Sequence, residues 1–279
     1  MRKIYHFLVS LIHFIKNGGN NIVKVNVSFL YPSSQFLGRN VLITGGTSGI
    51  GLEIAKEFLD EGAEVIITGR NQEKLDVTKQ IIKNERLHVL QWDVSDVESI
   101  DTKLLEMNNI IHNVDTFVNN AGIYGYDDWN TITPALYDKV MEVNQRGLFF
   151  MCQAEGKYLI ENKINGKIIN IVSIAGVKSG FDPYSVSKWG AMDITKGLAK
   201  ELVSKGIIVN GIAPGDVVTN IHDGYKGKDV NENAYAPEHK TKRYTLVEEV
   251  ASMTKYLASN AANNIVGQVF IIDGGWTLF

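Results

Sequence analysis

The residues best suited to chemistry in this chain of 279 residues are Tyr184 and Lys188, with Ser173 eleven positions upstream of the tyrosine. On a helix, a spacing of four places Tyr184 and Lys188 one turn apart on the same face. A free tyrosine titrates near pH 10, and a neighbouring cation lowers that pKa by favouring the phenolate. A tyrosine tuned in this way can pass a proton to or from a substrate oxygen. The alternative interpretation, two surface residues at an ordinary helical spacing, holds unless the rest of the chain supplies a matching site.

The composition is that of an ordinary globular protein, with 44% hydrophobic and 21% charged residues. The length suits one large α/β domain or two small ones. A net charge of -3 and the lack of an extended basic stripe give no indication of nucleic-acid binding. Cys152 is the only cysteine, which excludes an internal disulfide, weakly indicates a reducing compartment, and fits a buried structural thiol because it ends an apolar run. No zinc-type spacing is present, so no metal site is predicted.

The first 35 residues form an extension that precedes the main domain, residues 36–279. Residues 1–17 have a polar stripe at helical spacing on an otherwise apolar helix, and the uncharged apolar run, 4–15, is too short to span a bilayer. This helix is expected either to lie on a membrane surface or to dock on its own domain or a sister subunit. A cleaved signal peptide is disfavoured because no small-residue cleavage site is visible. Residues 22–29 alternate apolar and polar side chains, which predicts a strand with one buried face, able to add to a sheet edge.

A glycine-rich turn follows the first strand of the main domain. Residues 41–43 are a short buried strand, residues 44–51 read TGGTSGIG, and residues 52–59 open an amphipathic helix. Such glycines allow a tight turn and a close approach of pyrophosphate to the backbone, while the helix N-terminus offers amides and partial positive charge. The spacing is G-x-x-x-G-x-G rather than the commoner G-x-G-x-x-G. The alternative is a tight turn that binds nothing.

The next strand, 64–68, ends in Gly69 and Arg70. A site that prefers NAD usually has an acidic residue here, bound to the ribose 2′-hydroxyl. An arginine instead can pair with the 2′-phosphate of NADP. We therefore predict NADP, with NAD less favoured; the alternative is that Arg70 pairs with a nearby surface carboxylate.

Two further strands, 87–91 and 115–118, continue the pattern of strand, turn and helix. Asp93 follows the first of them and is expected to accept a hydrogen bond from the adenine amino group or to cap the helix that begins near Ser95. Repetition of this unit every 20 to 30 residues predicts an α/β fold, with a parallel sheet, helices on both faces, and ligands at the carboxyl ends of the strands.

At this point the chain resembles the short-chain dehydrogenase/reductases, in their single-domain form, over roughly residue 36 to the C-terminus. Each motif is weak alone, but their order and spacing together are specific. The motifs that carry the resemblance are Thr44-Gly45-x-x-x-Gly49-x-Gly51, Asp93, Asn119-Asn120-Ala121-Gly122, Asn144, Ser173, Tyr184-x-x-x-Lys188, Pro214-Gly215 with Thr219, and Asp273-Gly274-Gly275. The resemblance implies a Rossmann-like, doubly wound, mostly parallel seven-stranded sheet.

The resemblance also implies a catalytic tetrad of Asn144, Ser173, Tyr184 and Lys188. Tyr184 would be the general acid for carbonyl reduction and the base for alcohol oxidation. Lys188 would lower its pKa and bind the nicotinamide ribose. Ser173 would hydrogen-bond the substrate oxygen, and Asn144 would hold a water on the proton path to Lys188. The residues expected to bind the cofactor are Thr44, Gly45, Thr47, Ser48, Gly49, Ile50, Gly51, Arg70, Asp93, Val94, Asn120, Ala121, Gly122, Tyr184, Lys188, Pro214, Gly215, Val217 and Thr219.

The sequence departs from the family pattern near the substrate. The loop 174–183 is shorter than in many members, and Val172 stands where a second serine is common. Ser173 keeps the catalytic assignment because it ends the strand 167–171; Ser179 is the runner-up hydroxyl. Asp216 follows Pro214-Gly215 where the family tends to be small or apolar, and is expected to face the substrate or cap the next turn.

Residues 216–245 are the expected substrate lid, and their polar composition weakly favours a polar substrate such as a sugar derivative or hydroxy acid. The alternative is that these polar residues face solvent.

The predicted function is an NADP(H)-dependent oxidoreductase that interconverts a secondary alcohol and a carbonyl. The alternatives are an NAD-dependent dehydrogenase, a related epimerisation or dehydration, and a non-catalytic nucleotide-binding scaffold. The resemblance further implies a cytoplasmic homodimer or homotetramer, with peripheral membrane contact through residues 1–17 left open.

Overall fold

The computed structural model describes residues 34–125, 128–217 and 235–278, the helical residues 8–9, 11–12 and 14–16, and the backbone of residues 22–24 and 232–234. Most of the predicted N-terminal helix, the second half of the predicted strand 22–29, Thr219, and residues 218–231 of the expected lid lie outside the described residues.

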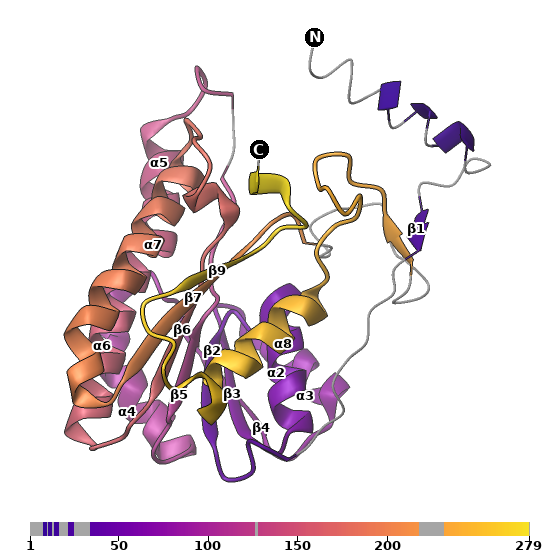
Figure 1. Ribbon diagram of the computed structural model, residues 1–279. Helices are drawn as coiled ribbons and strands as arrows, with labels where there is room; N and C mark the ends of the chain where they lie inside the picture. Colours follow the sequence, from indigo (N-terminus) through magenta and orange to yellow (C-terminus); the bar gives the residue numbers. More distant parts are fainter. Residues whose placement is uncertain are drawn as a thin grey trace.

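A seven-stranded sheet forms the centre of the molecule (Figure 1). Its strands stand in the order β4-β3-β2-β5-β6-β7-β9, and every neighbouring pair is parallel. The chain winds outward in one direction from β2 to β4 and in the other from β5 to β9, so the order reverses between β2 and β5. The strands are β2 (Asn40–Thr44), β3 (Glu64–Gly69), β4 (Leu87–Gln91), β5 (Thr116–Asn119), β6 (Lys167–Ile171), β7 (Ile208–Pro214) and β9 (Val269–Ile272).

Alternating side chains along the central strands build a separate core on each face of the sheet. On β2, Val41 and Ile43 join one core while Leu42 joins the other, and all three are fully buried. The period-two alternation of a strand, with both faces covered, explains why β2 is apolar at successive positions. The doubly wound parallel fold predicted from the sequence is confirmed.

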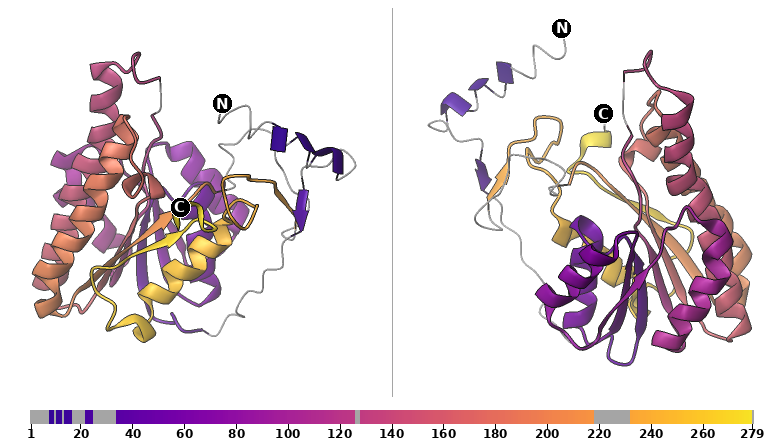
Figure 2. Two further views of the ribbon diagram at one scale, coloured as in Figure 1. Left: turned by 45° about the horizontal axis from the view of Figure 1, so that its top comes forward. Right: turned by 180° about the vertical axis from the view of Figure 1, so that it is seen from behind.

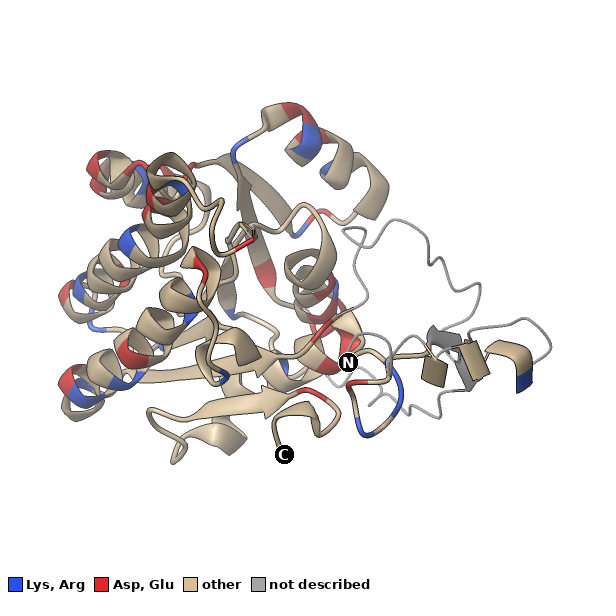
Figure 3. Ribbon diagram, turned by 90° about the horizontal axis from the view of Figure 1, so that it is seen from above, with Lys and Arg blue, Asp and Glu red and all other residues tan. Residues whose placement is uncertain are grey.

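Helices cover both faces of the sheet, as Figures 1 and 2 show. The core on one face is closed by α2, α3 and α8, and the core on the other by α4, α6 and α7. Along the outer helices, basic and acidic residues are interspersed rather than segregated (Figure 3). The helices are α2 (Gly49–Asp60), α3 (Gln72–Ile82), α4 (Ile100–Ile110), α5 (Pro134–Met141), α6 (Leu148–Glu161), α7 (Pro183–Leu202) and α8 (Val247–Ala258).

The N-terminal extension meets the expected lid rather than the edge of the main sheet. Strand β1 (Ile22–Lys24) pairs antiparallel with β8 (Glu232–Ala234) in a separate two-stranded sheet. For residues 22–24, the part of the segment 22–29 that the structure describes, the predicted strand is confirmed, and its partner is β8. Five of the described apolar residues of the N-terminal helix, Leu8, Leu11, Ile12, Phe14 and Ile15, are exposed, Ile15 by 66%. Within the described part of the chain, no helix is long and apolar enough to cross a membrane.

Candidate active site

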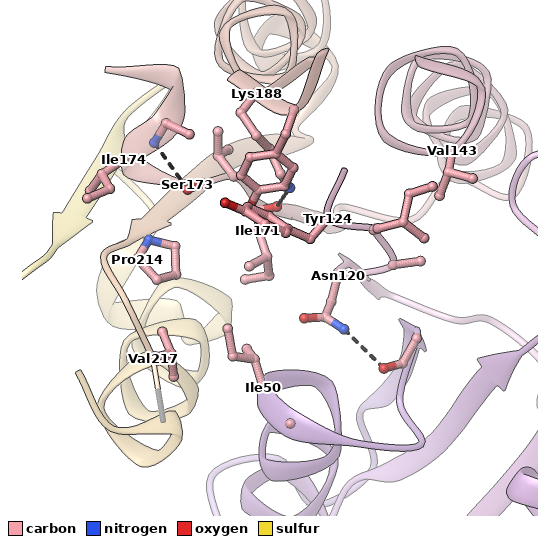
Figure 4. A pocket seen from close by; sticks show the side chains of 18 of the residues that line it. Ile50, Asn120, Tyr124, Val143, Ile171, Ser173, Ile174, Lys188, Pro214 and Val217 are labelled. Carbon is pink, nitrogen blue, oxygen red and sulfur yellow. Dashed lines mark hydrogen bonds between the residues drawn. The ribbon is translucent and has the colours of Figure 1, made fainter. Parts of the chain in front are cut away.

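A cavity of about 1080 Å³ opens at the carboxyl ends of the strands. It lies where the strand order reverses, between β2 and β5, the usual ligand position in such sheets. Its volume is at the upper end of the roughly 300–1000 Å³ typical of small-molecule sites. Figure 4 shows Ser173, Tyr124 and Lys188 around one part of the cavity, with Ile50 and Asn120 across from them.

The glycine turn between β2 and α2 brings bare backbone to the cavity wall. Gly45 and Gly49 have positive φ angles of 67° and 55°, which side-chain-bearing residues rarely adopt. A Cβ on Gly45 would lie 3.0 Å from the Cα of Ala121. A Cβ on Gly51 would collide with the Asn120 side-chain amide and the Gly45 carbonyl, so this glycine lets α2 pack closely on the strand ends.

Thr44 and Asn120 lock the ends of β2 and β5 together. The Thr44 hydroxyl accepts hydrogen bonds from the amides of Asn120 and Ala121, both at 3.0 Å. The Asn120 side-chain amide donates in return to the carbonyls of Thr44 and Gly45, at 3.0 and 3.1 Å. Thr44 is buried and, like Gly51, does not line the cavity. Thr44 and Gly51 therefore support the cavity wall without lining the cavity themselves.

The residues present fit a dinucleotide. The N-terminus of α2, with Ser48 as its N-cap, lines the cavity through Ser48, Gly49 and Ile50, as pyrophosphate binding requires. At the far end, Thr68 and Trp92 line the cavity, and the Thr68 hydroxyl and the Trp92 indole nitrogen are buried with no hydrogen-bond partner among the described residues. Asp93 also lines this end, and its Oδ1 accepts from the amide and the hydroxyl of Ser95, at 3.0 and 2.7 Å.

Arg70 stands at the same end of the cavity, directly after β3. Its side chain is exposed, and within the described part of the chain no carboxylate forms an ion pair with it. Gly69, before it, carries no side chain that could bind the ribose hydroxyls. The surface ion pair considered as the alternative role for Arg70 is therefore not found among these residues.

Helix α7 positions Tyr184 and Lys188. Asp182 is its N-cap: Oδ1 accepts from the Ser185 amide at 2.8 Å, and Pro183 occupies the first helical position, an arrangement that starts helices efficiently. Tyr184 therefore lies in the first turn and Lys188 one turn later, with the Lys188 ammonium 5.6 Å from the centre of the Tyr184 ring. Both line the cavity.

Ser173 meets Tyr184 from the end of β6. Its hydroxyl lies close enough to the Tyr184 phenol to oppose the rise of the tyrosine's pKa, and it accepts a hydrogen bond from the Ala175 amide at 3.1 Å, which fixes its orientation. Ser179 lines the same cavity, but it has no comparable influence on the pKa of Tyr184. The geometry therefore favours Ser173 over the runner-up hydroxyl.

The pKa values of the pair follow from burial. Burial raises the pKa of Tyr184, the neighbouring Ser173 hydroxyl opposes this rise, and Tyr124 and the carboxylates of Asp216 and Asp182 add to it. Burial also lowers the pKa of Lys188 to about 8. The expected lowering of the Tyr184 pKa by Lys188 is not seen, because the lysine itself loses hydration and its Nζ is directed to the carbonyl of Ile171, at 3.2 Å.

Asn144 lies behind the cavity rather than in its wall. It belongs to η2, a π-helical segment (Glu142–Gly147) between α5 and α6, and such segments often mark functional positions. Its side chain is held on both sides by Ile123, accepting from the amide and donating to the carbonyl, each at 2.8 Å. A Cβ on Gly122 would lie 3.3 Å from Asn144 Oδ1 and 3.7 Å from Lys188 Nζ. The asparagine and the lysine thus approach each other across Gly122.

Most predicted site residues line this one cavity. Those that do are Gly45, Thr47, Ser48, Gly49, Ile50, Arg70, Asp93, Val94, Asn120, Ala121, Gly122, Ser173, Tyr184, Lys188, Pro214, Gly215 and Val217. Thr44, Gly51 and Asn144 lie behind its wall, and Thr219 is outside the described residues.

Several lining residues were missed by the sequence analysis. Tyr124 packs on Tyr184 with ring centres 5.0 Å apart, and the ammonium of Lys178 stands 3.8 Å from the centre of the Trp276 ring. Tyr124, Lys178 and Trp276, together with Asp216, line the same cavity as the proposed tetrad residues Ser173, Tyr184 and Lys188. No local sequence motif marks Tyr124, Lys178 or Trp92 as site residues. Asp182, which also lines the cavity, differs from them because an aspartate followed by a proline is a recognisable helix start.

Comparison with known proteins agrees with this architecture. A family model described as Enoyl-(Acyl carrier protein) reductase matches residues 45–277. Gluconate 5-dehydrogenase of Gluconobacter oxydans (strain 621H) is 30% identical over 245 residues, covering 86% of this chain and 95% of the relative.

Other relatives carry different names. The 3-oxoacyl-(acyl-carrier-protein) reductase FabG of Aquifex aeolicus (strain VF5) is 32% identical over 243 residues, 85% of this chain and 97% of the relative. An NAD-dependent glycerol dehydrogenase of Listeria innocua is also 32% identical over 243 residues, 85% of this chain and 93% of the relative. From the shared motifs, the doubly wound sheet and these matches, we conclude that the chain belongs to the short-chain dehydrogenase/reductase family and is an oxidoreductase of alcohol or carbonyl groups.

Proposed function

We propose that the chain is an NADP(H)-dependent oxidoreductase that interconverts a secondary alcohol and a carbonyl, with Tyr184 as general acid and base. The observation that carries the proposal is the grouping of Tyr184, Ser173 and Lys188 in the same cavity as the glycine turn. The closeness of the Ser173 hydroxyl to Tyr184 supports it, because one substrate oxygen placed between them would contact both hydroxyl groups.

Each residue of this group has a distinct role in the proposal. The bound cofactor supplies or accepts the hydride. Ser173 hydrogen-bonds the substrate oxygen and orients it, while Tyr184 gives that oxygen a proton in reduction and removes it in oxidation. Lys188 holds the cofactor ribose and, once the cofactor and solvent reach it, favours the phenolate. Asn144, through its backbone, holds the water that links Lys188 to solvent.

Tyr184→Phe tests the catalytic assignment. The variant loses the phenolic proton but keeps the ring that packs on Tyr124, so turnover is expected to disappear while NADPH binding stays nearly unchanged. Turnover is measured by NADPH absorbance across a panel of ketones, keto-sugars and β-ketoacyl thioesters, and binding by titration. A variant that still turns over would show that Tyr184 is not the acid and base. A wild-type protein that binds NADPH but reduces none of the panel would favour the nucleotide-binding scaffold.

The preference for NADP rests on Arg70, which would pair with the 2′-phosphate at the end of β3. NADPH is expected to raise the melting temperature more than NADH at equal concentration, because a ligand that binds the folded state stabilises it according to its affinity. Arg70→Ala should remove this difference, whereas Lys79→Ala, an exposed cation on the following helix, should leave it unchanged. A larger shift with NADH would instead support the NAD-dependent alternative, to which the name of one relative points.

The domain division at residue 36 and the homodimer or homotetramer remain proposals, as do the cytoplasmic location and the peripheral membrane contact through residues 1–17. Light scattering of the purified chain would report the oligomeric state. Flotation with anionic vesicles would report the membrane contact.

A further inference from the structure

Residues 232–246, called here the arm, connect the N-terminal extension to the wall of the cavity. At its outer end, the backbone of β8 pairs with β1, with Ile22 opposite Ala234, Val23 opposite Asn233 and Lys24 opposite Glu232. Figures 1 and 2 show the two strands side by side, away from the main sheet. These three pairs join the N-terminal extension to the segment expected to cover the substrate.

The middle of the arm folds back on itself and docks on the C-terminal turn. Tyr235 bridges to Arg243, and the Ala236 amide donates to the Lys242 carbonyl at 3.1 Å. At the tip, the amides of Lys240 and Thr241 both donate to the carbonyl of Gly274, at 2.8 and 3.1 Å. The arm is therefore fixed to the segment that also carries Trp276.

His239 fills the space between the arm and the strand ends. Its side chain is fully buried, and neither ring nitrogen has a hydrogen-bond partner among the described residues. The ring centre lies 5.3 Å from that of Trp276 and 5.8 Å from that of Tyr244. A Cβ on Gly215 would lie 3.3 Å from the His239 Cε1. Because the ring makes close packing contacts and no hydrogen bonds, its contribution is the shape of the imidazole rather than its polarity.

The inner end of the arm is joined to the cavity wall itself. The Thr245 amide donates to the Asp216 carbonyl at 2.9 Å, and the Thr245 hydroxyl donates to the Ile272 carbonyl at 3.1 Å. Arg243 binds both carboxylate oxygens of Glu249, at 2.8 and 2.6 Å, which ties the arm to the first turn of α8. Asp216 lines the cavity close enough to Tyr184 to raise its pKa, and Trp276 lines the same cavity. An unbroken series of contacts therefore runs from β1 to the cavity wall.

We propose that the arm positions the substrate end of the cavity, that His239 is its positioning residue, and that β1 clamps its outer end. The N-terminal extension then acts on substrate binding through the backbone pairs of β1, at a distance from the chemistry. The inference rests on the proposed function, since it assigns the end of the cavity beside Tyr184 to the substrate.

Substitutions in the full-length chain test both parts. Val23→Pro removes a backbone donor from the centre of β1 and opposes the pairing, whereas Val23→Thr keeps the amide and a β-branched side chain. His239→Ala empties the space filled by the ring, whereas His239→Phe refills it without nitrogen. We expect the KM for the carbonyl substrate to rise about tenfold in His239→Ala and about threefold in Val23→Pro. The dissociation constant of NADPH should stay unchanged, and Val23→Thr and His239→Phe should resemble the wild type.

Hydrogen exchange provides a readout that needs no substrate. Peptides covering residues 239–246 should exchange faster in Val23→Pro and His239→Ala, because their amides are bonded to Gly274 and Asp216. If no substrate is turned over, the proposed function fails, and exchange still decides whether β1 holds the arm. Unchanged exchange in Val23→Pro would overturn the clamp. Faster exchange without a change in KM, or equal weakening of NADPH and substrate binding, would overturn the positioning role.

Discussion

At the scale of single residues, the proposed proton chemistry depends on the Ser173 hydroxyl beside Tyr184. Burial, Tyr124 and two carboxylates raise the pKa of Tyr184, and the Ser173 hydroxyl is the neighbour that lowers it. Ser173 is therefore expected both to hold the substrate oxygen and to keep the phenol within reach of its working protonation state.

Ser173→Ala should lower kcat by roughly 100-fold, the cost typical of losing one donor to a reacting oxygen. It should also raise the Tyr184 pKa further, so the rise of alcohol oxidation with pH moves to higher pH. Steady-state rates measured across pH would show both effects. Ser179→Ala is the matched comparison, and a larger loss there would transfer the catalytic role to that hydroxyl.

The grouping of Ser173, Tyr184 and Lys188 at one cavity could be predicted from the sequence because their positions depend on local spacing and strand ends. Tyr184 and Lys188 share one helical face, and Ser173 follows a strand, so each carries a local signal. Tyr124 and Lys178 carry none, because only tertiary packing brings them to Tyr184 and Trp276. The raised Tyr184 pKa could not be predicted either, since burial depends on the whole surrounding structure.

At the scale of elements, close packing between η3 (Ile174–Gly176) and α7 sets the distance from Ser173 to Tyr184. A Cβ on Gly176 would lie 2.5 Å from the Lys188 carbonyl oxygen and 2.8 Å from its carbon. Because backbone atoms make this contact, the two elements would have to separate to admit a side chain.

Gly176→Ala should therefore lower both the melting temperature and kcat, because Ser173 lies at the start of the displaced segment. Gly197→Ala on α7 is the control: no neighbouring atom lies within 4 Å of the added methyl, and alanine favours a helix over glycine by roughly 0.5–1 kcal/mol. Calorimetry should thus show a lower melting temperature for Gly176→Ala and a higher one for Gly197→Ala than for the wild type. A Gly176→Ala protein with unchanged stability and rate would show that this contact does not set the geometry.

Element types were easier to predict than their details. The strand 167–171 coincides with β6, whereas the helix expected near Ser95 opens with a 3₁₀ turn (Val97–Ser99) before α4. The π-helical segment that holds Asn144 leaves no pattern in the sequence, because its extra residue is stabilised by contacts such as those with Ile123. The pairing of β1 with β8 was missed because alternation predicts a strand but not its partner.

At the scale of the whole molecule, a buried polar cluster joins β5 and α6 to β6 and α7, the two elements that position Ser173, Tyr184 and Lys188. Glu155 on α6 is fully buried, and its Oε2 accepts from the Asn119 side-chain amide on β5 at 2.9 Å. That amide also donates to Asn170 on β6 at 3.1 Å, and Asn170 donates to Thr195 on α7 at 2.9 Å. The second carboxyl oxygen, Oε1, has no partner among the described residues. Ionisation of Glu155 would therefore place a poorly compensated charge between two strands and two helices.

This cluster should make global stability depend on pH. Burial raises the pKa of Glu155 from 4.5 to about 8, so between these values the folded chain keeps a proton that the unfolded chain has released. The stabilisation is complete below pH 4.5 and is lost as pH rises to about 8, by at most roughly 1.4 kcal/mol per pH unit.

Glu155→Gln removes the titration, so its free energy of unfolding, measured with denaturant between pH 5 and 8, should fall less steeply than that of the wild type. Glu161→Gln, at the exposed end of the same helix, should keep the wild-type slope. Equal slopes for wild type and Glu155→Gln would mean that Glu155 is already ionised in the folded protein, and that the cluster is held by a charge rather than by a shared proton.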